Sequence, residues 1–187
     1  MTLPAPSIPS NRSAESAPQR PTFAFMAPRL AHWIAFGFGS GLARWAPGTV
    51  GTLWAWAAYA ILQRWLTPAG FGWLIAVSLP LGWWACTVTA RRMNIADPGS
   101  IVWDEVVAFW IVLWIVMPTG LLGQLVAFAL FRFFDAAKPG PVAWADRLFK
   151  QRDATRIDWW RAGFGIMLDD LVAAFCTLLV IALARAW

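Results

Sequence analysis

The sequence predicts an all-α fold, a polytopic membrane bundle of short helices with an acidic site at one membrane interface. Hydrophobic residues make up 59% of the 187 positions and charged residues only 13%, which leaves too little polar surface for a soluble domain of this length. The apolar residues gather in runs of helical length, and many of the 15 Trp residues flank these runs. Because indoles favour the headgroup region of a bilayer, we interpret the runs as membrane helices.

We expect a disordered N-terminal tail over residues 1–22, followed by one membrane-embedded domain over residues 23–187. The tail, "MTLPAPSIPSNRSAESAPQRPT", is rich in Pro, Ser and Ala and lacks the apolar core of a signal peptide.

The first half of the domain predicts an interfacial segment and a helical hairpin. Residues 23–53 read as a short helix followed by a glycine-punctuated loop. Apolar runs from 52 to 66 and from 71 to 90 are joined by the turn "TPAG", and their spacing predicts two helices. A polar break, "RRMNIADPGS", follows at 91–100.

The second half predicts another hairpin and a final helix. The runs 101–117 and 121–138 are joined by "PTG" at 118–120. At about 1.5 Å per residue each reaches roughly 25 Å, barely enough for a hydrocarbon core of about 30 Å. After a polar segment at 139–165, the last helix is expected over 166–187, with its acids in the first turn.

Counting these crossings places most charged residues on one side of the membrane. By the positive-inside rule this side is cytoplasmic, and only Arg64 and Arg185 fall near the other face. The predicted cytoplasmic groups are the 37–51 loop, Arg91 and Arg92, the acids discussed next, and the basic 138–161 segment.

Carboxylates from three helix ends are predicted to converge at this face. The macrodipole favours acids near a helix N-terminus by only about 0.3–1 kcal/mol each, and it does not explain the acid near a C-terminus. Converging carboxylates repel unless a cation shares the site, and hard oxygen ligands suit Mg²⁺. The alternative is a set of helix caps with a structural polar network. The predicted catalytic residues and metal ligands are Asp104, Glu105, Asp135, Asp169 and Asp170.

The glycine-rich stretch "GFGSGLARWAPGTVGTL" (37–53) is a candidate phosphate-binding loop. Such a loop exposes backbone N–H groups, and a helix starting near Gly51 adds its positive end. The alternative is packing, because Gly37 and Gly41 have the GxxxG spacing of membrane helix contacts. The predicted substrate-binding residues here are Gly39, Ser40, Gly41, Pro47, Gly48, Thr49 and Gly51.

Two cations accompany the acids in "FRFFDAAKPGP" (131–141). Arg132 and Asp135 are three residues apart and share a helical face, and Lys138 follows one turn later. Both cations are predicted to bind the substrate's anionic group, or to neutralise the acids structurally.

With these residues assembled, the chain resembles the phosphatidylglycerophosphatase A family of bacterial membrane lipid phosphatases over residues 30–185. Between Arg147 and the last motif it inserts "LFKQRDATRIDWWRA" (148–162). The resemblance is carried by "GFGSGLARWAPGTVGTL", "GSIVWDEVV" (99–107), "FRFFDAAKPGPV" (131–142) and "GFGIMLDDLVAA" (163–174).

The resemblance implies a Mg²⁺-dependent enzyme at the bacterial inner membrane, with its active site facing the cytoplasm. Its substrate would be phosphatidylglycerophosphate within bilayer lipid, its product phosphatidylglycerol, and nucleic acid is not an expected partner. Two rivals remain. A membrane phosphatidyltransferase would show a concentrated Asp-rich block, and a transporter or channel subunit would spread its acids through membrane depth. The oligomeric state is not predicted.

Overall fold

We describe the chain from a computed structural model, which covers residues 20–149 and 157–186 in describable detail. Residues 1–19 of the predicted tail and residues 150–156 of the inserted segment lie outside the described residues.

Every regular element in the described ranges is a helix, as the sequence predicts. The four helices of the two predicted hairpins are present, but the first turn lies at 63–67 and not at 67–70, and the second at 117–120. Of the two pairs, α5 packs against α6, whereas α3 packs mainly against α5 and not against α4. The elements are α1 (Phe23–Met26), α2 (Leu30–Ala35), the 3-10 helix η1 (Gly37–Leu42), α3 (Pro47–Leu62), α4 (Pro68–Met93), α5 (Trp103–Val116), α6 (Leu121–Ala137), α7 (Pro141–Phe149) and α8 (Trp159–Ala186).

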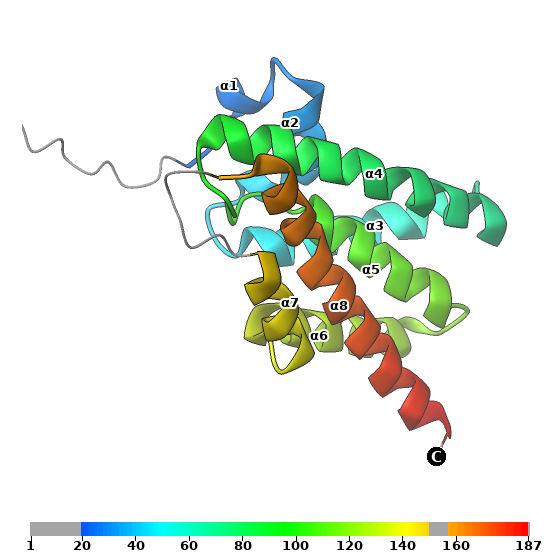
Figure 1. Ribbon diagram of the computed structural model, residues 1–187. Helices are drawn as coiled ribbons and strands as arrows, with labels where there is room; N and C mark the ends of the chain where they lie inside the picture. Colours follow the sequence, from blue (N-terminus) through cyan, green and yellow to red (C-terminus); the bar gives the residue numbers. More distant parts are fainter. Residues whose placement is uncertain (1–19, 150–156, 187) are drawn as a thin grey trace, which may run out of the picture.

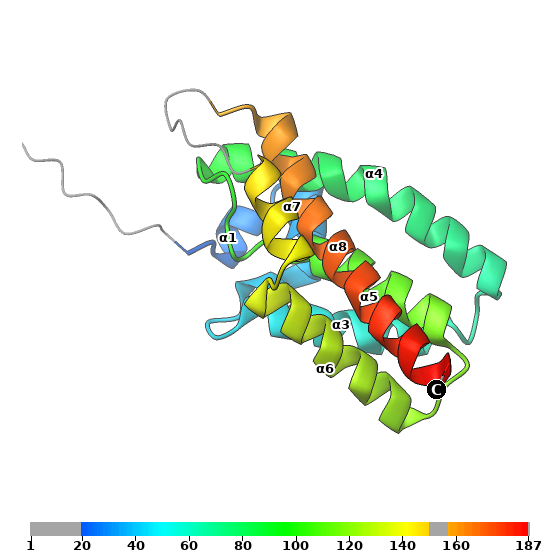
Figure 2. The same cartoon turned by 60° about the horizontal axis from the view of Figure 1, so that its bottom comes forward.

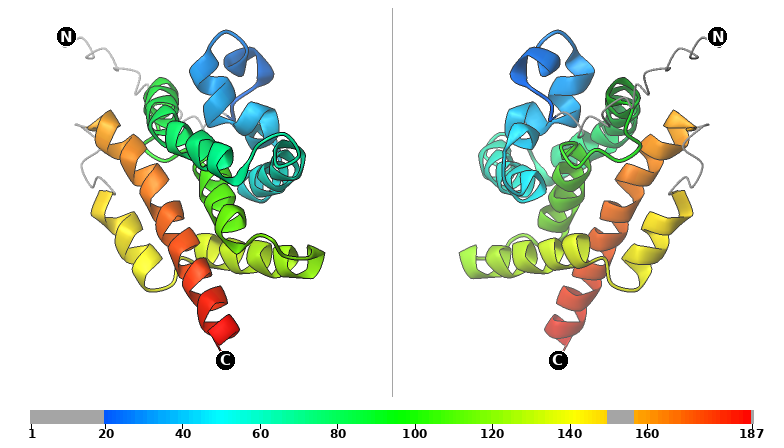
Figure 3. Two further views of the ribbon diagram at one scale, coloured as in Figure 1. Left: turned by 90° about the vertical axis from the view of Figure 1, so that its right-hand side faces the viewer. Right: turned by 90° about the vertical axis from the view of Figure 1, so that its left-hand side faces the viewer.

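The helix α5 lies at the centre of the molecule and α8 crosses it (Figure 1). Along its length α8 packs against α4, α5, α6 and α7, and Figure 2 shows it running from beside α7 to the C-terminal end. The helix α3 also packs against α5, whereas α1 and α2 lie on the opposite side of α5 from α6 (Figure 3).

The sequence of α5 explains its central position. After Glu105 it carries no charged residue, and a helix that is apolar on all sides needs neighbours on all sides. Val106, Val107, Ala108 and Phe109 have no exposed surface. The acids at its start are therefore held on an immobilised helix.

Two helices are long and apolar enough to cross a membrane. They are α4, with 26 residues and a mean hydropathy of 1.5, and α8, with 28 residues and a mean hydropathy of 2.3. At about 1.5 Å per residue both exceed the roughly 30 Å hydrocarbon core. The 14 residues of α5 reach only about 21 Å.

The structure corrects the predicted start of the last helix, because α8 begins at Trp159 and not at residue 166. Its first turns contain Gly163 and Gly165, which disfavour helix by about 1 kcal/mol each. A Cβ on Gly163 would overlap Thr87 Oγ1 and lie 2.9 Å from the Thr87 backbone nitrogen. Glycine is thus needed where α8 approaches α4, and packing overrides helix propensity.

The polar 139–165 segment also contains a helix that the sequence did not predict, the nine-residue α7. One face of α7 buries Val142 and Ala145 against the molecule, while Trp144 and Leu148 are exposed. This amphipathic helix packs along the first half of α8 (Figure 2). It brings a further acid, Asp146, to the site described next.

Candidate functional site

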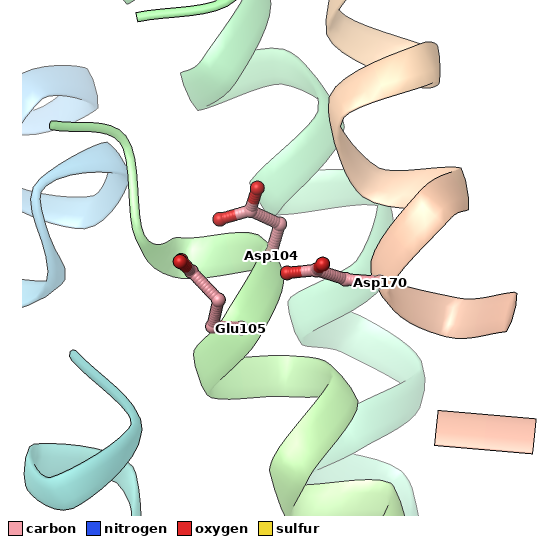
Figure 4. A group of neighbouring side chains, drawn as sticks. All are labelled: Asp104, Glu105 and Asp170. Carbon is pink, nitrogen blue, oxygen red and sulfur yellow. The ribbon is translucent and has the colours of Figure 1, made fainter. Parts of the chain in front are cut away.

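Three carboxylates from two helices meet near the start of α5. Asp104 and Glu105 lie in its first turn, and Asp170 points toward them from α8 (Figure 4). One oxygen of each residue lies within 4.8 Å of an oxygen of the other two. Asp170 therefore joins two residues at least 65 positions before it in one cluster, which we call the acid cluster.

The glycine-rich segment fixes the start of α5. The Val102 N–H donates to Ala35 O at 2.9 Å, a Cβ on Gly41 would overlap Ser100 O, and a Cβ on Gly51 would lie 2.7 Å from Val102 Cβ. Only glycine allows this approach at either position. Packing therefore explains glycine at these two positions, but the predicted GxxxG pair, Gly37 and Gly41, lies in the 3-10 helix η1 and not in a membrane helix.

Asp170 lies within α8 and not at its end. Because α8 begins at Trp159, no acid occupies its first turn, and the helix macrodipole, which acts within the first turn, does not stabilise this carboxylate. Asp170 is only 3% exposed. Its burial in an apolar helix needs another compensating interaction.

The acid cluster contains oxygens without hydrogen-bond donors. Among the described residues, Asp104 Oδ1, Glu105 Oε2 and Asp170 Oδ2 are buried and have no partner. Opposite ligands on one Mg²⁺, with bonds of about 2.1 Å, are about 4.2 Å apart, close to the 4.8 Å limit of this set. The donor chemistry and spacing therefore fit a divalent ion of this kind.

Arg132 and Asp135 border the acid cluster from α6. Arg132 pairs with Asp135, lies 3.8 Å from Glu105 Oε1, and donates to Thr52 Oγ1 at 3.3 Å. Asp135 also lies near the Asp170 carboxylate. Arg132 and Asp135 share a helical face, as the sequence predicts, and the ion pair that they form adjoins two members of the cluster.

Lys138 and Asp169 form a second ion pair at the border. The Lys138 ammonium donates to Asp169 Oδ2 at 2.5 Å and to Asp146 Oδ1 at 2.7 Å. Burial alone would lower the pKa of Lys138, but these two hydrogen bonds outweigh it and raise the pKa above its usual value. The ammonium therefore stays charged at neutral pH.

The start of α3 lies against this site. The sequence predicted a helix from Gly51, but α3 begins at Pro47, which places Gly48 and Thr49 in its first turn. A Cβ on Gly48 would overlap Glu105 Oε1 and lie 3.2 Å from an Arg132 guanidinium nitrogen. The positive end of α3 thus adjoins Glu105 and Arg132.

The remaining loop residues lie elsewhere in η1. Gly39 has a left-handed backbone (φ +104°), and a Cβ there would meet only Met26, at 3.8 Å. Ser40 Oγ donates to Gly37 O at 2.9 Å, so its hydroxyl is engaged within η1. Phosphate binding by Gly39 and Ser40 stays a prediction.

Sequence reasoning missed two residues of the site. Thr52 accepts from Arg132 and donates to Gly48 O at 2.9 Å, which links α6 to the start of α3. Asp146 holds Lys138 from α7. The apolar surroundings of Thr52 and the amphipathic pattern of α7 were the available signals, but neither reveals a contact 80 positions away.

The fold and the site define a helical, membrane-associated protein with a buried carboxylate cluster suited to a divalent ion. The model of a known family, described as phosphatidylglycerophosphatase A, matches residues 33–185. This chain belongs to the phosphatidylglycerophosphatase A family, as its motifs predict.

Individual relatives agree with this assignment. Phosphatidylglycerophosphatase A of Haemophilus influenzae is 39% identical over 156 residues, covering 83% of this chain and 89% of the relative. The Escherichia coli protein of the same name is 37% identical over 143 residues, covering 76% of each. A putative phosphatidylinositol-3-phosphatase of Bacteroides thetaiotaomicron is 33% identical over 172 residues, covering 89% of this chain and 97% of the relative. No solved structure matches the chain.

Proposed function

We propose that this chain removes the terminal phosphate from phosphatidylglycerophosphate, giving phosphatidylglycerol and inorganic phosphate in glycerophospholipid synthesis. Membership of the family supports this reaction. The observation that carries it is the acid cluster, whose buried oxygens lack donors although they lie close together. Such a set is costly without a bound cation.

In this proposal Asp104, Glu105 and Asp170 hold Mg²⁺. A divalent ion held there would polarise the phosphate and stabilise charge on the leaving oxygen. Asp135 and Asp169 each adjoin a cation at the border of the cluster, and their prediction as metal ligands is retained for testing.

Asp135 is the residue that we assign to the attacking water. It adjoins Asp170, and its pairing with Arg132 fixes the direction of its carboxylate. A carboxylate held in this way orients the water and takes its proton as the bond to phosphorus forms.

Three groups would bind the oxygens of the terminal phosphate. The Arg132 guanidinium presents several N–H donors in one plane, and the first turn of α3, at Gly48 and Thr49, presents backbone N–H groups beside it. Lys138, held by Asp146 and Asp169, adds a fixed positive charge at the border of the cluster.

We further propose a polytopic arrangement in the bacterial inner membrane, with the site at the cytoplasmic face. The lengths of α4 and α8 support two crossings, and the shorter hairpin of α5 and α6 would complete the bundle. Exposed tryptophans occur toward the site, at Trp45 and Trp160, and at the other end, at Trp65 and Trp73, as expected of residues in the two headgroup regions.

The proposal is tested by assaying phosphate release from phosphatidylglycerophosphate in detergent micelles, with Mg²⁺, with EDTA, and with Mg²⁺ restored. We expect release with Mg²⁺, loss in EDTA and recovery on restoration. Phosphatidylinositol 3-phosphate belongs in the same assay, because one relative is named for it. Metal-dependent release from phosphatidylinositol 3-phosphate alone would show that this lipid, and not phosphatidylglycerophosphate, is the substrate. The absence of metal-dependent release from both lipids would contradict the proposal.

A further inference from the structure

A cavity of about 280 Å³ opens beside the proposed active site. One wall is the turn between η1 and α3, with Gly41, Arg44 and Pro47, and the other is the segment between α4 and α5, with Gly99 and Ser100. Arg20 lies at the edge and donates from its guanidinium to Arg44 O at 3.2 Å. We call this space the arginine cavity.

The arginine cavity adjoins the acid cluster along two chain segments. Pro47 lines the cavity, and the next residue, Gly48, lies against Glu105 and Arg132. On the other wall Ser100 precedes Asp104 by four residues. Two short chain segments therefore connect the walls of the cavity to the residues around the acid cluster.

The charge of this cavity selects for anions. Its described lining includes two arginines and no carboxylate. A second cavity of about 140 Å³, lined by Asp97, Asp146 and Asp169, borders the site and has the opposite character. Of the two spaces, only the arginine cavity attracts a second phosphate.

The position of Arg44 also suits a lipid head group. Arg44 is exposed at the rim, and the following residue, Trp45, is 87% exposed. An exposed Arg–Trp pair is typical of the depth at which phospholipid head groups lie. The cavity volume, close to the lower end of about 300 Å³ for small-molecule sites, is suited to a head group and not to acyl chains.

We propose that the arginine cavity binds the phosphodiester of the lipid head group while the terminal phosphomonoester occupies the acid cluster. This inference rests on the proposed function and extends it. Phosphatidylglycerophosphate carries both phosphates, joined by one glycerol, so a site with two adjoining phosphate subsites recognises it over a lipid with a single phosphate. Arg44 is the specificity-determining residue.

The test separates the two halves of the head group by inhibition. The product phosphatidylglycerol, as a short-chain form, keeps the phosphodiester, whereas inorganic phosphate resembles the group at the acid cluster. For Arg44→Ala we expect a KM for phosphatidylglycerophosphate and a Ki for short-chain phosphatidylglycerol that both rise about 5- to 10-fold, the loss of one charge-assisted hydrogen bond. The kcat and the Ki for inorganic phosphate should change less than about 2-fold, because Arg44 does not reach the reacting group.

Arg64→Ala is the matched control. Arg64 is an exposed arginine that also precedes an exposed tryptophan, Trp65, but it lies beyond the opposite end of α3. Its constants should equal those of the wild type, and Arg44→Lys should restore part of the affinity. An unchanged KM and phosphatidylglycerol Ki in Arg44→Ala, an equal rise in Arg64→Ala, or a wild type that phosphatidylglycerol does not inhibit would each overturn the inference. A wild type without metal-dependent phosphate release would instead refute the proposed function.

Discussion

Asp169 and Asp170 are adjacent on α8 but have different partners: Asp169 accepts a hydrogen bond from Lys138, whereas Asp170 joins Asp104 and Glu105. Adjacent helical residues point about 100° apart, so one carboxylate enters the acid cluster and the other faces an ammonium. The two residues should therefore respond oppositely to the same substitution.

Asp170→Asn should stabilise the metal-free protein. It removes a buried negative charge whose Oδ2 has no donor, and relief of such an unsatisfied group is worth about 1–3 kcal/mol. Thermal unfolding in detergent with EDTA measures this effect, and the midpoint should rise. Added Mg²⁺ should stabilise the variant less than it stabilises the wild type. A lower unfolding midpoint for the variant in EDTA would show that the Asp170 carboxylate does not destabilise the metal-free protein.

Asp169→Asn should destabilise the protein, because the half-buried Lys138 ammonium loses one of its two carboxylates. In a double-mutant cycle with Lys138→Met we expect a coupling energy of about 0.5–3 kcal/mol, the range for residues in direct contact. The free energies of unfolding of the four proteins give this quantity. Strictly additive effects would mean that the pair contributes nothing to stability.

Gly48→Ala should reduce turnover because the new methyl group would occupy the position of Glu105 Oε1 and crowd Arg132. A displacement of about 1 Å in a site that positions reacting groups costs on the order of 100-fold in rate. Gly120→Ala is the control, because nothing lies within 4 Å of a Cβ at Gly120. Steady-state rates of phosphate release decide the matter, and equal rates in both variants would place Gly48 outside the site.

Much of the helical architecture could be predicted from the sequence because segments containing Pro and Gly separate the long apolar segments. The breaks "TPAG" and "PTG" contain Pro at positions that bound a helix: Pro68 is the first residue of α4, and Pro118 follows the end of α5. The start of α8 and the whole of α7 could not be predicted in this way. The start of α8 depends on tertiary contacts, such as that of Gly163 with Thr87, because its two glycines disfavour helix, and α7 is too short for its pattern to stand out from the polar segment around it.

The sequence could predict which residues of the candidate site lie at the same end of the molecule, but not how they contact one another. Hydrophobic spacing predicted that five acids and two cations lie at the same end of the molecule. It did not reveal which acid forms an ion pair with Lys138 and which with Arg132. The Lys138–Asp169 pair depends on how α6 and α8 rotate against each other, whereas Arg132 and Asp135 pair within one turn of α6. Asp146 was missed for the same reason, since its helix is positioned by packing against α8.

Arg132→Lys should lose most activity although it keeps the charge. The guanidinium contacts Asp135, Thr52 and Glu105 together, and a single ammonium does not reproduce that planar set of donors. Loss of one charged hydrogen bond, about 1.5–3 kcal/mol, corresponds to roughly a 10- to 100-fold lower kcat/KM. The conservative change Arg161→Lys, at an exposed residue over Phe149, should leave kcat/KM unchanged. Full activity in Arg132→Lys would show that only the positive charge of Arg132 is needed, and not the geometry of its guanidinium group.

The central claim is that the acid cluster of α5 and α8 binds the divalent ion on which lipid phosphate hydrolysis depends. Calorimetric titration of Mg²⁺ into the purified wild type and Asp170→Asn proteins, in the same detergent used to assay phosphate release, tests it most directly. We predict saturable binding by the wild type, and a loss of both binding and release in the variant. Wild-type affinity and wild-type release in Asp170→Asn would contradict the claim.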